Sequence, residues 1–244
     1  MSTDRYARHL ALAGFGAAEQ ARLRDATALV IGAGGLGSPA LLYLAAAGIG
    51  RLAVSDFDTV DVTNLQRQVL FTTDDIGRPK SEAAGLRLAA LNPDTQVEPI
   101  PARLTGDALA MTVARADVVL DCCDNFATRF ALNAACVAAG KPLVSGAAIR
   151  FEGQLAVFRA DRGGGPCYRC LWEEDAEGLE DCRGNGVLGP VTGVVGSMMA
   201  VEALKIASGC APSADGKLML YDAREGSWRS LRIERDPACP VCSG

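Results

Sequence analysis

The sequence predicts an α/β fold with a mostly parallel sheet, helices on both faces and an antiparallel extension. Two observations carry this prediction. Apolar strand patterns alternate with helical patterns through the first 150 residues, which is typical of a parallel sheet. Beyond Gly146 the hydrophobic pattern changes to a period of two, as in antiparallel strands with one covered face. A chain of 244 residues that is 49% hydrophobic can bury a full core.

The first part of the chain contains most of the predicted elements. Strands are expected at 28–33, 51–55, 96–100, 117–121 and 142–146, and helices at 38–48, 80–91, 106–115 and 126–139. Boundary signals support these ranges. Pro79 precedes the helix at 80–91, Asn92-Pro93 ends it, and Gly140 follows the last helix.

Three alternating segments in the second part predict the antiparallel strands, at 151–158, 217–221 and 228–233. An acidic, glycine-bearing loop from Glu173 to Gly189 lies between them, and a helix is expected from about Val191 to Ser208. The longest uncharged run, 186–201, is shorter than a membrane span and contains Pro190, so we expect a buried helix and no membrane contact.

Composition excludes several functional classes. The formal net charge of −5 argues against general nucleic-acid binding, because no basic face could neutralise a phosphate backbone. The N-terminal residues carry early charges and no apolar segment of the signal-peptide type. Nine cysteines in a chain with ample apolar material indicate a reducing cytoplasm rather than a secreted disulfide scaffold. The single histidine, His9, lies in a polar N-terminal segment, which argues against a Ser-His-Asp triad.

A glycine turn, Gly32-Ala33-Gly34-Gly35-Leu36-Gly37, connects the first strand to the first helix. In this context backbone N–H groups and a helix N-terminus face anionic oxygens, as in Rossmann-like nucleotide sites. Asp56 ends the next strand about 20 residues later, the spacing of a carboxylate that accepts hydrogen bonds from ribose hydroxyls. The alternatives are a turn that needs glycine for steric reasons and a solvated acid at a strand end.

Four cysteines form two C-x-x-C pairs. Cys167 with Cys170 and Cys239 with Cys242 are separated by about 70 residues. Two such pairs can complete a closed tetrahedral shell of four thiolates around Zn²⁺, which leaves no open position for a substrate and is therefore structural. A redox pair or free thiols remain the alternative.

Taken together, the motifs resemble the MoeB/ThiF/HesA family of adenylating enzymes, whose fold is shared by ubiquitin-activating enzymes. Among its branches, the match looks closest to molybdopterin-synthase adenylyltransferases, with no rhodanese domain after Gly244. The resemblance spans nearly the whole chain. Its motifs are Arg5-Tyr6-x-Arg8, Gly32 to Gly37, Asp56, Asn64-Leu65-Gln66-Arg67-Gln68, Gly77-Arg78-Pro79-Lys80, Asp121-Cys122-Cys123-Asp124-Asn125, Ser145-Gly146-Ala147-Ala148 and the paired C-x-x-C elements.

The resemblance implies ATP-dependent adenylation of the C-terminal glycine of a ubiquitin-like sulfur carrier with a Gly-Gly tail, releasing pyrophosphate. Arg67 and Lys80 would offset phosphate charge, and Asp124 would hold Mg²⁺ unless it serves as the N-cap of the following helix. The chain would be one adenylating domain, 1–244, with a nucleotide-binding half (1–146) and a carrier and zinc half (147–244). The residues expected to bind nucleotide are Gly32, Gly34, Gly35, Gly37, Asp56, Thr63, Asn64, Arg67, Lys80, Asp124 and Asn125.

Two further residues take roles only from the resemblance. Arg8 would reach the ATP site of the other subunit of a homodimer, and Cys182 would be a cysteine that some branches link covalently to the carrier. His9 and Cys123 depart from the family pattern, which often has glutamine and threonine there.

Two other functions fit parts of the sequence. A nicotinamide-dependent oxidoreductase would use the glycine turn and Asp56 but would leave Arg67, Lys80 and Asp124 without a role. A non-catalytic scaffold could bind a ubiquitin-like partner, although it would not need these three residues. The sequence leaves the molybdenum cofactor and thiamine pathways both open.

Overall fold

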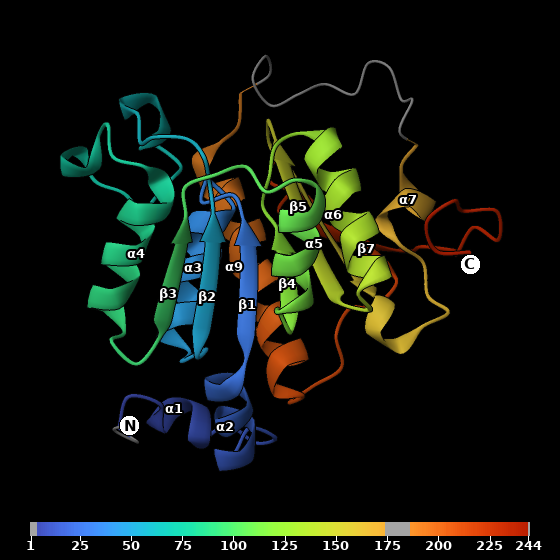
Figure 1. The fold of residues 1–244 in the computed structure, drawn as a ribbon, viewed down its shortest axis with the longest axis horizontal. Coiled ribbons are helices and arrows are strands. Elements are labelled where there is room, and N and C mark those ends of the chain that lie inside the picture. Colours follow the sequence, from blue (N-terminus) through green and yellow to red (C-terminus); the bar gives the residue numbers. More distant parts are fainter. Residues whose placement is uncertain (1–3, 174–185, 244) are drawn as a thin grey trace.

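The computed structural model describes residues 4–173 and 186–243, which contain one eight-stranded sheet (Figure 1). The strand order is β3-β2-β1-β4-β5-β6-β7-β8. The first five strands in this order run parallel and the rest pair antiparallel. Their bounds are β1 Thr27–Ile31, β2 Arg51–Ser55, β3 Gln96–Ile100, β4 Val118–Asp121, β5 Pro142–Ile149, β6 Glu152–Arg159, β7 Lys217–Asp222 and β8 Ser227–Arg232.

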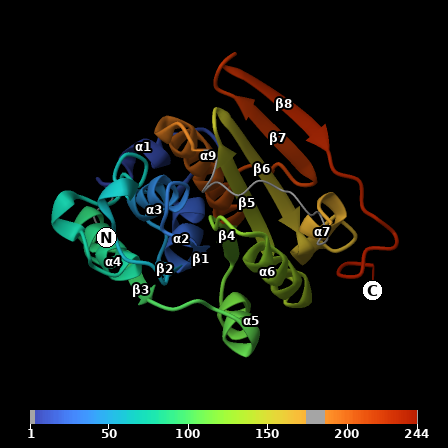
Figure 2. The ribbon, with the colours of Figure 1, turned by 90° about the horizontal axis from the view of Figure 1, so that it is seen from above.

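Helices cover both faces of the parallel part (Figure 2). On one face lie α3 (Gly37–Ala46), α4 (Lys80–Leu91) and α9 (Gly189–Ser208), and on the other lie α5 (Gly106–Ala114) and α6 (Phe126–Ala138). Successive side chains of a strand point to opposite faces. In β1, Val30 belongs to the core under α3 and α9, whereas Leu29 belongs to the core under α5 and α6. The doubly covered sheet that the alternating pattern predicts is confirmed.

The sequence patterns did not predict some of the short helices. The helices α1 (Ala7–Leu10) and α2 (Ala17–Asp25) pack below the amino ends of the strands, and α7 (Tyr168–Leu171) follows the β6 segment (Figure 1). Only Gln20 and Leu23 of α2 are buried, so its sequence shows little apolar periodicity. Short 3₁₀ turns occur at Val62–Asn64, Thr73–Asp75 and Ala160–Arg162.

Strand β5 runs to Ile149 and so extends past its predicted end at 146. The reason is its pairing with β6, which continues without a break to Ile149 opposite Glu152. Two residues, Arg150 and Phe151, make the turn, and Arg150 adopts a positive φ of 53°. This tight connection places the end of β5 and the start of β6 side by side, next to the carboxyl ends of the parallel strands.

The helix α9 is long and apolar enough to cross a membrane, judged by length and composition alone. Half of its apolar window is buried inside the protein, where it belongs to the core shared with α3, β5 and β6. Glu202, which is buried in this helix, forms a 2.8 Å ion pair with Lys205. The predicted buried core helix is confirmed.

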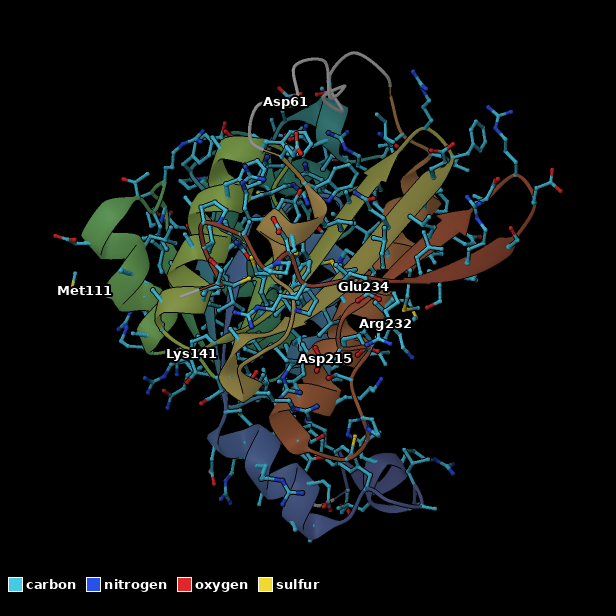
Figure 3. The ribbon with its side chains drawn as sticks, turned by 90° about the vertical axis from the view of Figure 1, so that its right-hand side faces the viewer. Asp61, Met111, Lys141, Asp215, Arg232 and Glu234 are labelled. Carbon is cyan, nitrogen blue, oxygen red and sulfur yellow. The ribbon has the colours of Figure 1, made fainter. Side chains whose placement is uncertain are left out.

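The sheet ends in an exposed strand, β8, none of whose residues is buried. Figure 3 views this side of the molecule, with Arg232 and Glu234 near one another on the surface. Their ion pair spans 3.4 Å between largely exposed side chains, so it contributes little to stability. Asp61, in the segment after β2, lies near the top of this view.

Candidate active site

The largest concentration of predicted site residues lines one pocket at the carboxyl ends of the parallel strands. The order of the sheet reverses between β1 and β4, and such a switch point leaves a crevice outside the strand ends. The pocket has a volume of about 370 Å³. We call it the glycine-turn pocket. Its lining includes Gly32, Gly34, Gly35, Asp56, Asp58, Arg67, Gln68, Lys80, Arg103, Cys123, Asp124, Asn125, Arg129, Ala147, Ala148, Val187 and Thr192.

The glycines of the turn serve two purposes: the backbone geometry requires glycine at some positions, and some of the glycines line the pocket. Gly32 has a φ of +94°, and a Cβ there would lie 2.8 Å from the carbonyl oxygen of Cys122. A Cβ at Gly37 would overlap the carbonyl of Gly32, so this close approach needs glycine as well. Gly34 and Gly35 line the pocket, whereas Gly37 begins α3 and is not in the lining. Steric need and ligand access therefore both apply within one motif.

Asp56 lines the pocket and also holds the glycine turn in place. Its Oδ2 accepts the Ala33 N–H at 2.8 Å, and its Oδ1 accepts the Asp58 N–H at 2.9 Å. Burial raises the pKa of Asp56, and the nearby charge of Lys80 and these N–H groups oppose that effect. Each carboxylate oxygen keeps a further lone pair that can accept a hydroxyl donor.

Two basic side chains reach the pocket, one from the start of α4 and one from the segment between β2 and α4. Lys80 begins α4 and is buried, and its Nζ lies 3.2 Å from Oδ2 of Asp58. Arg67 donates from Nη1 to the carbonyl oxygen of Thr63 at 3.1 Å. Both cations line the glycine-turn pocket.

Asp124 and Asn125 follow β4, and the structure separates their roles in capping α6. Asn125 is the N-cap residue, because its Oδ1 accepts the Thr128 N–H at 2.9 Å. The capping alternative for Asp124 is thus wrong. Asp124 is exposed and lines the pocket, so its carboxylate is available to a ligand.

Three residues of the lining carry signals that the sequence analysis did not use. Gln68 is 4% exposed, and its Oε1 has no hydrogen-bond partner among the described residues. A buried amide oxygen without a partner is costly and marks a place for a donor from a ligand or water. Arg103 stacks over the ring of Phe57 at 4.1 Å, and Arg129 is a buried cation. Gln68 belonged to a quoted motif and could have been named from it.

A second pocket adjoins the first and has a volume of about 310 Å³. We call it the hairpin pocket because β5, β6, β7 and β8 supply most of its walls. Asp124, Arg129, Ala147 and Ala148 line both pockets. The remaining lining is Phe126, Ile149, Glu152, Gly153, Gln154, Tyr168, Trp172, Leu220, Tyr221, Asp222, Ser227 and Arg229. The two pockets therefore meet at Asp124.

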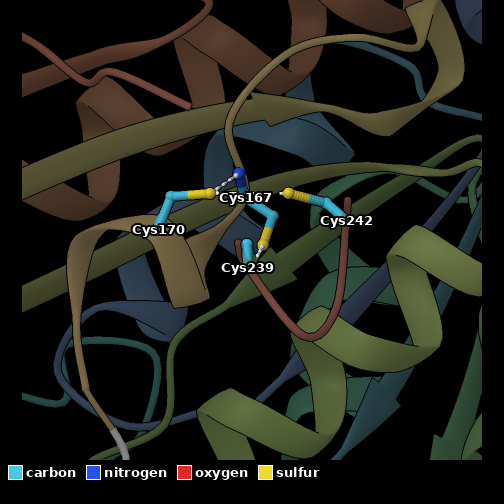
Figure 4. A group of neighbouring side chains, drawn as sticks. All are labelled: Cys167, Cys170, Cys239 and Cys242. Carbon is cyan, nitrogen blue, oxygen red and sulfur yellow. Dashed lines mark hydrogen bonds between the residues drawn. The ribbon is translucent and has the colours of Figure 1, made fainter. Parts of the chain in front are cut away.

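The four predicted metal ligands, Cys167, Cys170, Cys239 and Cys242, come together near α7 (Figure 4). Their sulfur atoms lie within 4.8 Å of one another, and the separations include 3.7 Å for Cys167 to Cys239 and 3.4 Å for Cys170 to Cys242. These distances are too long for disulfides, whereas tetrahedral Zn–S bonds of about 2.3 Å place sulfur atoms about 3.8 Å apart. The donor set fits Zn²⁺.

The remaining predicted residues lie away from the pockets or are not among the residues that the structure describes. Thr63 and Asn64 are not in the lining of the glycine-turn pocket, although they directly precede the Arg67 segment. Arg8 is exposed on α1, which lies at the opposite end of the sheet (Figure 1). Within one chain Arg8 therefore does not reach the pocket. Cys182 lies outside the described residues.

Comparison with known proteins identifies relatives of this arrangement. Residues 6–241 match the model of the ThiF family. The chain is 51% identical over 240 residues to a sulfur carrier protein ThiS adenylyltransferase of Escherichia coli, covering 98% of this chain and 95% of that protein. It is 46% identical over 238 residues to a molybdopterin-synthase adenylyltransferase of the same organism, with the same coverages.

Another relative and a solved structure are also similar to this chain. A SAMP-activating enzyme E1 of Haloferax volcanii is 45% identical over 241 residues, covering 98% of this chain and 88% of that protein. The crystal structure of Escherichia coli MccB with MccA-N7isoASN has the same fold, with a TM-score of 0.87, 24% identity, and coverage of 100% of this chain and 75% of that one. From this family match and these full-length identities, the chain belongs to the ThiF family and is an adenylyltransferase.

Proposed function

We propose that this protein activates a ubiquitin-like sulfur carrier by transferring AMP from ATP to the carboxylate of its C-terminal glycine. A carboxylate oxygen would form a bond to the α-phosphorus, and the bond from that phosphorus to the bridging oxygen would break, releasing pyrophosphate. The carrier would serve molybdenum cofactor or thiamine synthesis, since relatives named for both pathways are similar to this chain. We expect a cytoplasmic location from the cysteine content of the sequence.

The observation that carries this proposal is the junction of the two pockets at Asp124. An adenylation needs a nucleotide and an extended peptide tail to meet at one point. The glycine-turn pocket would bind ATP, and the part of the hairpin pocket next to Asp124, Ala147 and Ala148 would admit a tail without side chains. Small residues, Ala147 and Ala148, border the junction and leave room for a Gly-Gly terminus.

Charge in the glycine-turn pocket suits the reaction. The carboxylate and the triphosphate repel each other, so fixed cations that offset their charge lower the barrier. Lys80 and Arg67 would contact the phosphates, Asp56 would accept the ribose hydroxyls, and Gln68 Oε1 would gain its missing donor. Asn125, at the start of α6, would border the nucleotide, while Thr63 and Asn64 would reach it only after a shift of their loop.

Asp124 would hold the Mg²⁺ that accompanies ATP. Its carboxylate is exposed at the junction and takes no part in capping α6. When bound, Mg²⁺ would supply positive charge that offsets the charge of the phosphates. The protein's own part is to orient Asp124 toward that position.

The four-cysteine cluster would hold a structural Zn²⁺. Its two halves come from α7 and from the C-terminal segment, and the sulfur separations match a tetrahedral ion. Bound there, the ion would tie the C-terminal segment to the wall of the hairpin pocket. All four cysteines belong to the carrier and zinc half (147–244), so the ion would stabilise that half, which would form one adenylating domain with the nucleotide-binding half (1–146).

A homodimer would explain Arg8. Its helix lies at the end of the sheet away from the pocket, so a contact with nucleotide requires a second subunit. Tyr43 on α3 and Val201 on α9 are 57% and 46% exposed, which leaves apolar surface on the helical face for a partner copy. Cys182 stays a proposed point of covalent attachment in the carrier half.

Isotope exchange between pyrophosphate and ATP, measured with a Gly-Gly carrier, tests the function. Exchange requires reversible formation of the acyl-adenylate, so we expect it only when enzyme, Mg²⁺, ATP and carrier are all present. The oxidoreductase alternative predicts NAD binding and no exchange, and the scaffold alternative predicts carrier binding and no exchange. Exchange without carrier would contradict the proposal.

A further inference from the structure

A fully buried carboxylate lies at the end of β4, three residues before Asp124. Asp121 is 1% exposed. Its Oδ1 accepts the backbone N–H of Cys123 at 3.2 Å and the thiol of Cys123 at 2.8 Å. Its Oδ2 accepts the hydroxyl of Ser145 at 2.7 Å and Nη1 of Arg129 at 3.2 Å. Both oxygens of this carboxylate are therefore fully engaged by protein groups.

The partner cation, Arg129, fixes the ends of two neighbouring strands. Its side chain is 7% exposed. Besides Asp121, Nη1 donates to the Ser145 hydroxyl at 3.3 Å, while Nη2 donates to the carbonyl oxygens of Cys123 at 2.6 Å and Gly146 at 2.9 Å. The planar fork of a guanidinium can satisfy several acceptors at once, which a single ammonium cannot match. Arg129 thus links the segment after β4 to β5, which forms one wall of the hairpin pocket.

Asp124 sits between two residues that the protein holds rigidly. On one side, Cys123 is held through its N–H, its thiol and its carbonyl oxygen by Asp121 and Arg129. On the other side, Asn125 is held as the N-cap of α6. The position of Asp124 at the junction of the pockets follows from these contacts.

We propose that Arg129, acting with Asp121, is the positioning residue that aims Asp124 at the phosphate side of the junction. Arg129 would act through the backbone of Cys123 rather than by bonding to the reacting atoms. The inference rests on the proposed function for the role of Asp124, and it adds a residue that the sequence analysis left without one.

The test compares Arg129→Lys with a matched control in the same helix. Arg129→Lys keeps the charge but loses the fork, so Asp124 should move relative to its ligand. Loss of a group that orients a metal ligand typically lowers metal affinity by about 10- to 100-fold. We therefore expect the Mg²⁺ concentration for half-maximal pyrophosphate exchange to rise about tenfold or more, while ATP binding in EDTA stays close to wild type.

The control is Leu132→Ala, which removes core volume from α6 at a fully buried position away from the pockets. It should lower thermal stability without changing the Mg²⁺ dependence. A second variant, Ser145→Ala, removes one donor to Asp121 and should shift the Mg²⁺ dependence in the same direction even where Arg129→Lys folds poorly.

A measurement without nucleotide or metal separates this inference from the proposed function. Hydrogen exchange of the Cys123 amide should quicken in Arg129→Lys and Ser145→Ala but not in Leu132→Ala. If wild-type enzyme catalyses no isotope exchange between pyrophosphate and ATP, the proposed function fails. The hydrogen exchange of the Cys123 amide then still shows whether Arg129 holds the backbone before Asp124. A folded Arg129→Lys protein with unchanged Mg²⁺ dependence and an unchanged Cys123 amide would overturn the positioning role.

Discussion

At the scale of single residues, two neighbours with similar side chains do different things. Both Asp124 and Asn125 are favourable N-cap residues, so the sequence could not decide which one begins α6. The backbone decides it, since only Asn125 places its side-chain oxygen on the Thr128 N–H. Asp124 is thereby available at the junction of the pockets.

Replacing each of these two residues with alanine should separate an effect on activity from an effect on stability. Asp124→Ala should lower adenylation by about 10²-fold or more, because one oriented charged group is lost, and should leave the melting temperature unchanged. Asn125→Ala should instead lower the free energy of unfolding by about 1 kcal/mol through loss of the cap. Pyrophosphate exchange and thermal denaturation measure the two effects. Near-normal turnover of Asp124→Ala would remove the role proposed for it.

At the scale of elements, the packing of α9 on α3 requires a glycine at position 196 but not at position 193. A Cβ at Gly196 would lie 2.6 Å from Cγ of Pro39 and would also overlap the carbonyl of Leu36. A Cβ at Gly193, one turn earlier in α9, would meet nothing within 4 Å. The two positions look alike in the sequence and differ only in what lies opposite them.

Alanine at these two glycines should therefore have opposite effects. Gly196→Ala should destabilise the protein by about 1–3 kcal/mol, since α9 must move away from the start of α3 and from the glycine-turn pocket. Gly193→Ala should stabilise it by up to about 1 kcal/mol through helix propensity. Chemical denaturation of both variants provides the comparison, and equal effects would contradict the close packing.

The four-cysteine cluster is also an element-scale device, because it joins α7 to the C-terminal segment. Purified protein should contain one Zn²⁺ per chain, and Cys239→Ser should lower thermal stability more than adenylation per folded molecule. The matched control is Cys210→Ser, since Cys210 lies outside the cluster and should leave metal content unchanged. Metal analysis after reducing, chelator-free purification decides this, and a content near zero would exclude the zinc site.

Periodic elements were predictable from the sequence, and short ones were not. The strands and long helices of the sheet follow apolar periodicity, and the C-x-x-C spacing predicted the cluster seen near α7. The helices α1 and α2 bury few residues, so their sequences carry almost no periodic signal. Arg129 stands out only in three dimensions, because its burial depends on strands distant in sequence. Gln68 belonged to a quoted motif, but only the structure shows that its buried Oε1 has no hydrogen-bond partner among the described residues.

At the scale of the whole molecule, Arg8 is the residue that one chain cannot place at the pocket. If it completes the site of a partner copy, mixing Arg8→Ala with Asp124→Ala should restore activity. Equal amounts with random exchange give about half mixed dimers with one intact site each, so recovery should approach about a quarter of wild-type sites. No recovery despite confirmed subunit exchange would place Arg8 away from the partner's site.

The central claim is that ATP and the tail of a sulfur carrier meet at the junction of the two pockets. Mass spectrometry of a Gly-Gly carrier after incubation with enzyme and Mg-ATP tests it most directly. We expect an AMP adduct on the terminal glycine carboxylate, formed with wild-type enzyme and nearly absent with Asp124→Ala. An unmodified carrier beside active, folded enzyme, or an adduct on another residue, would contradict it.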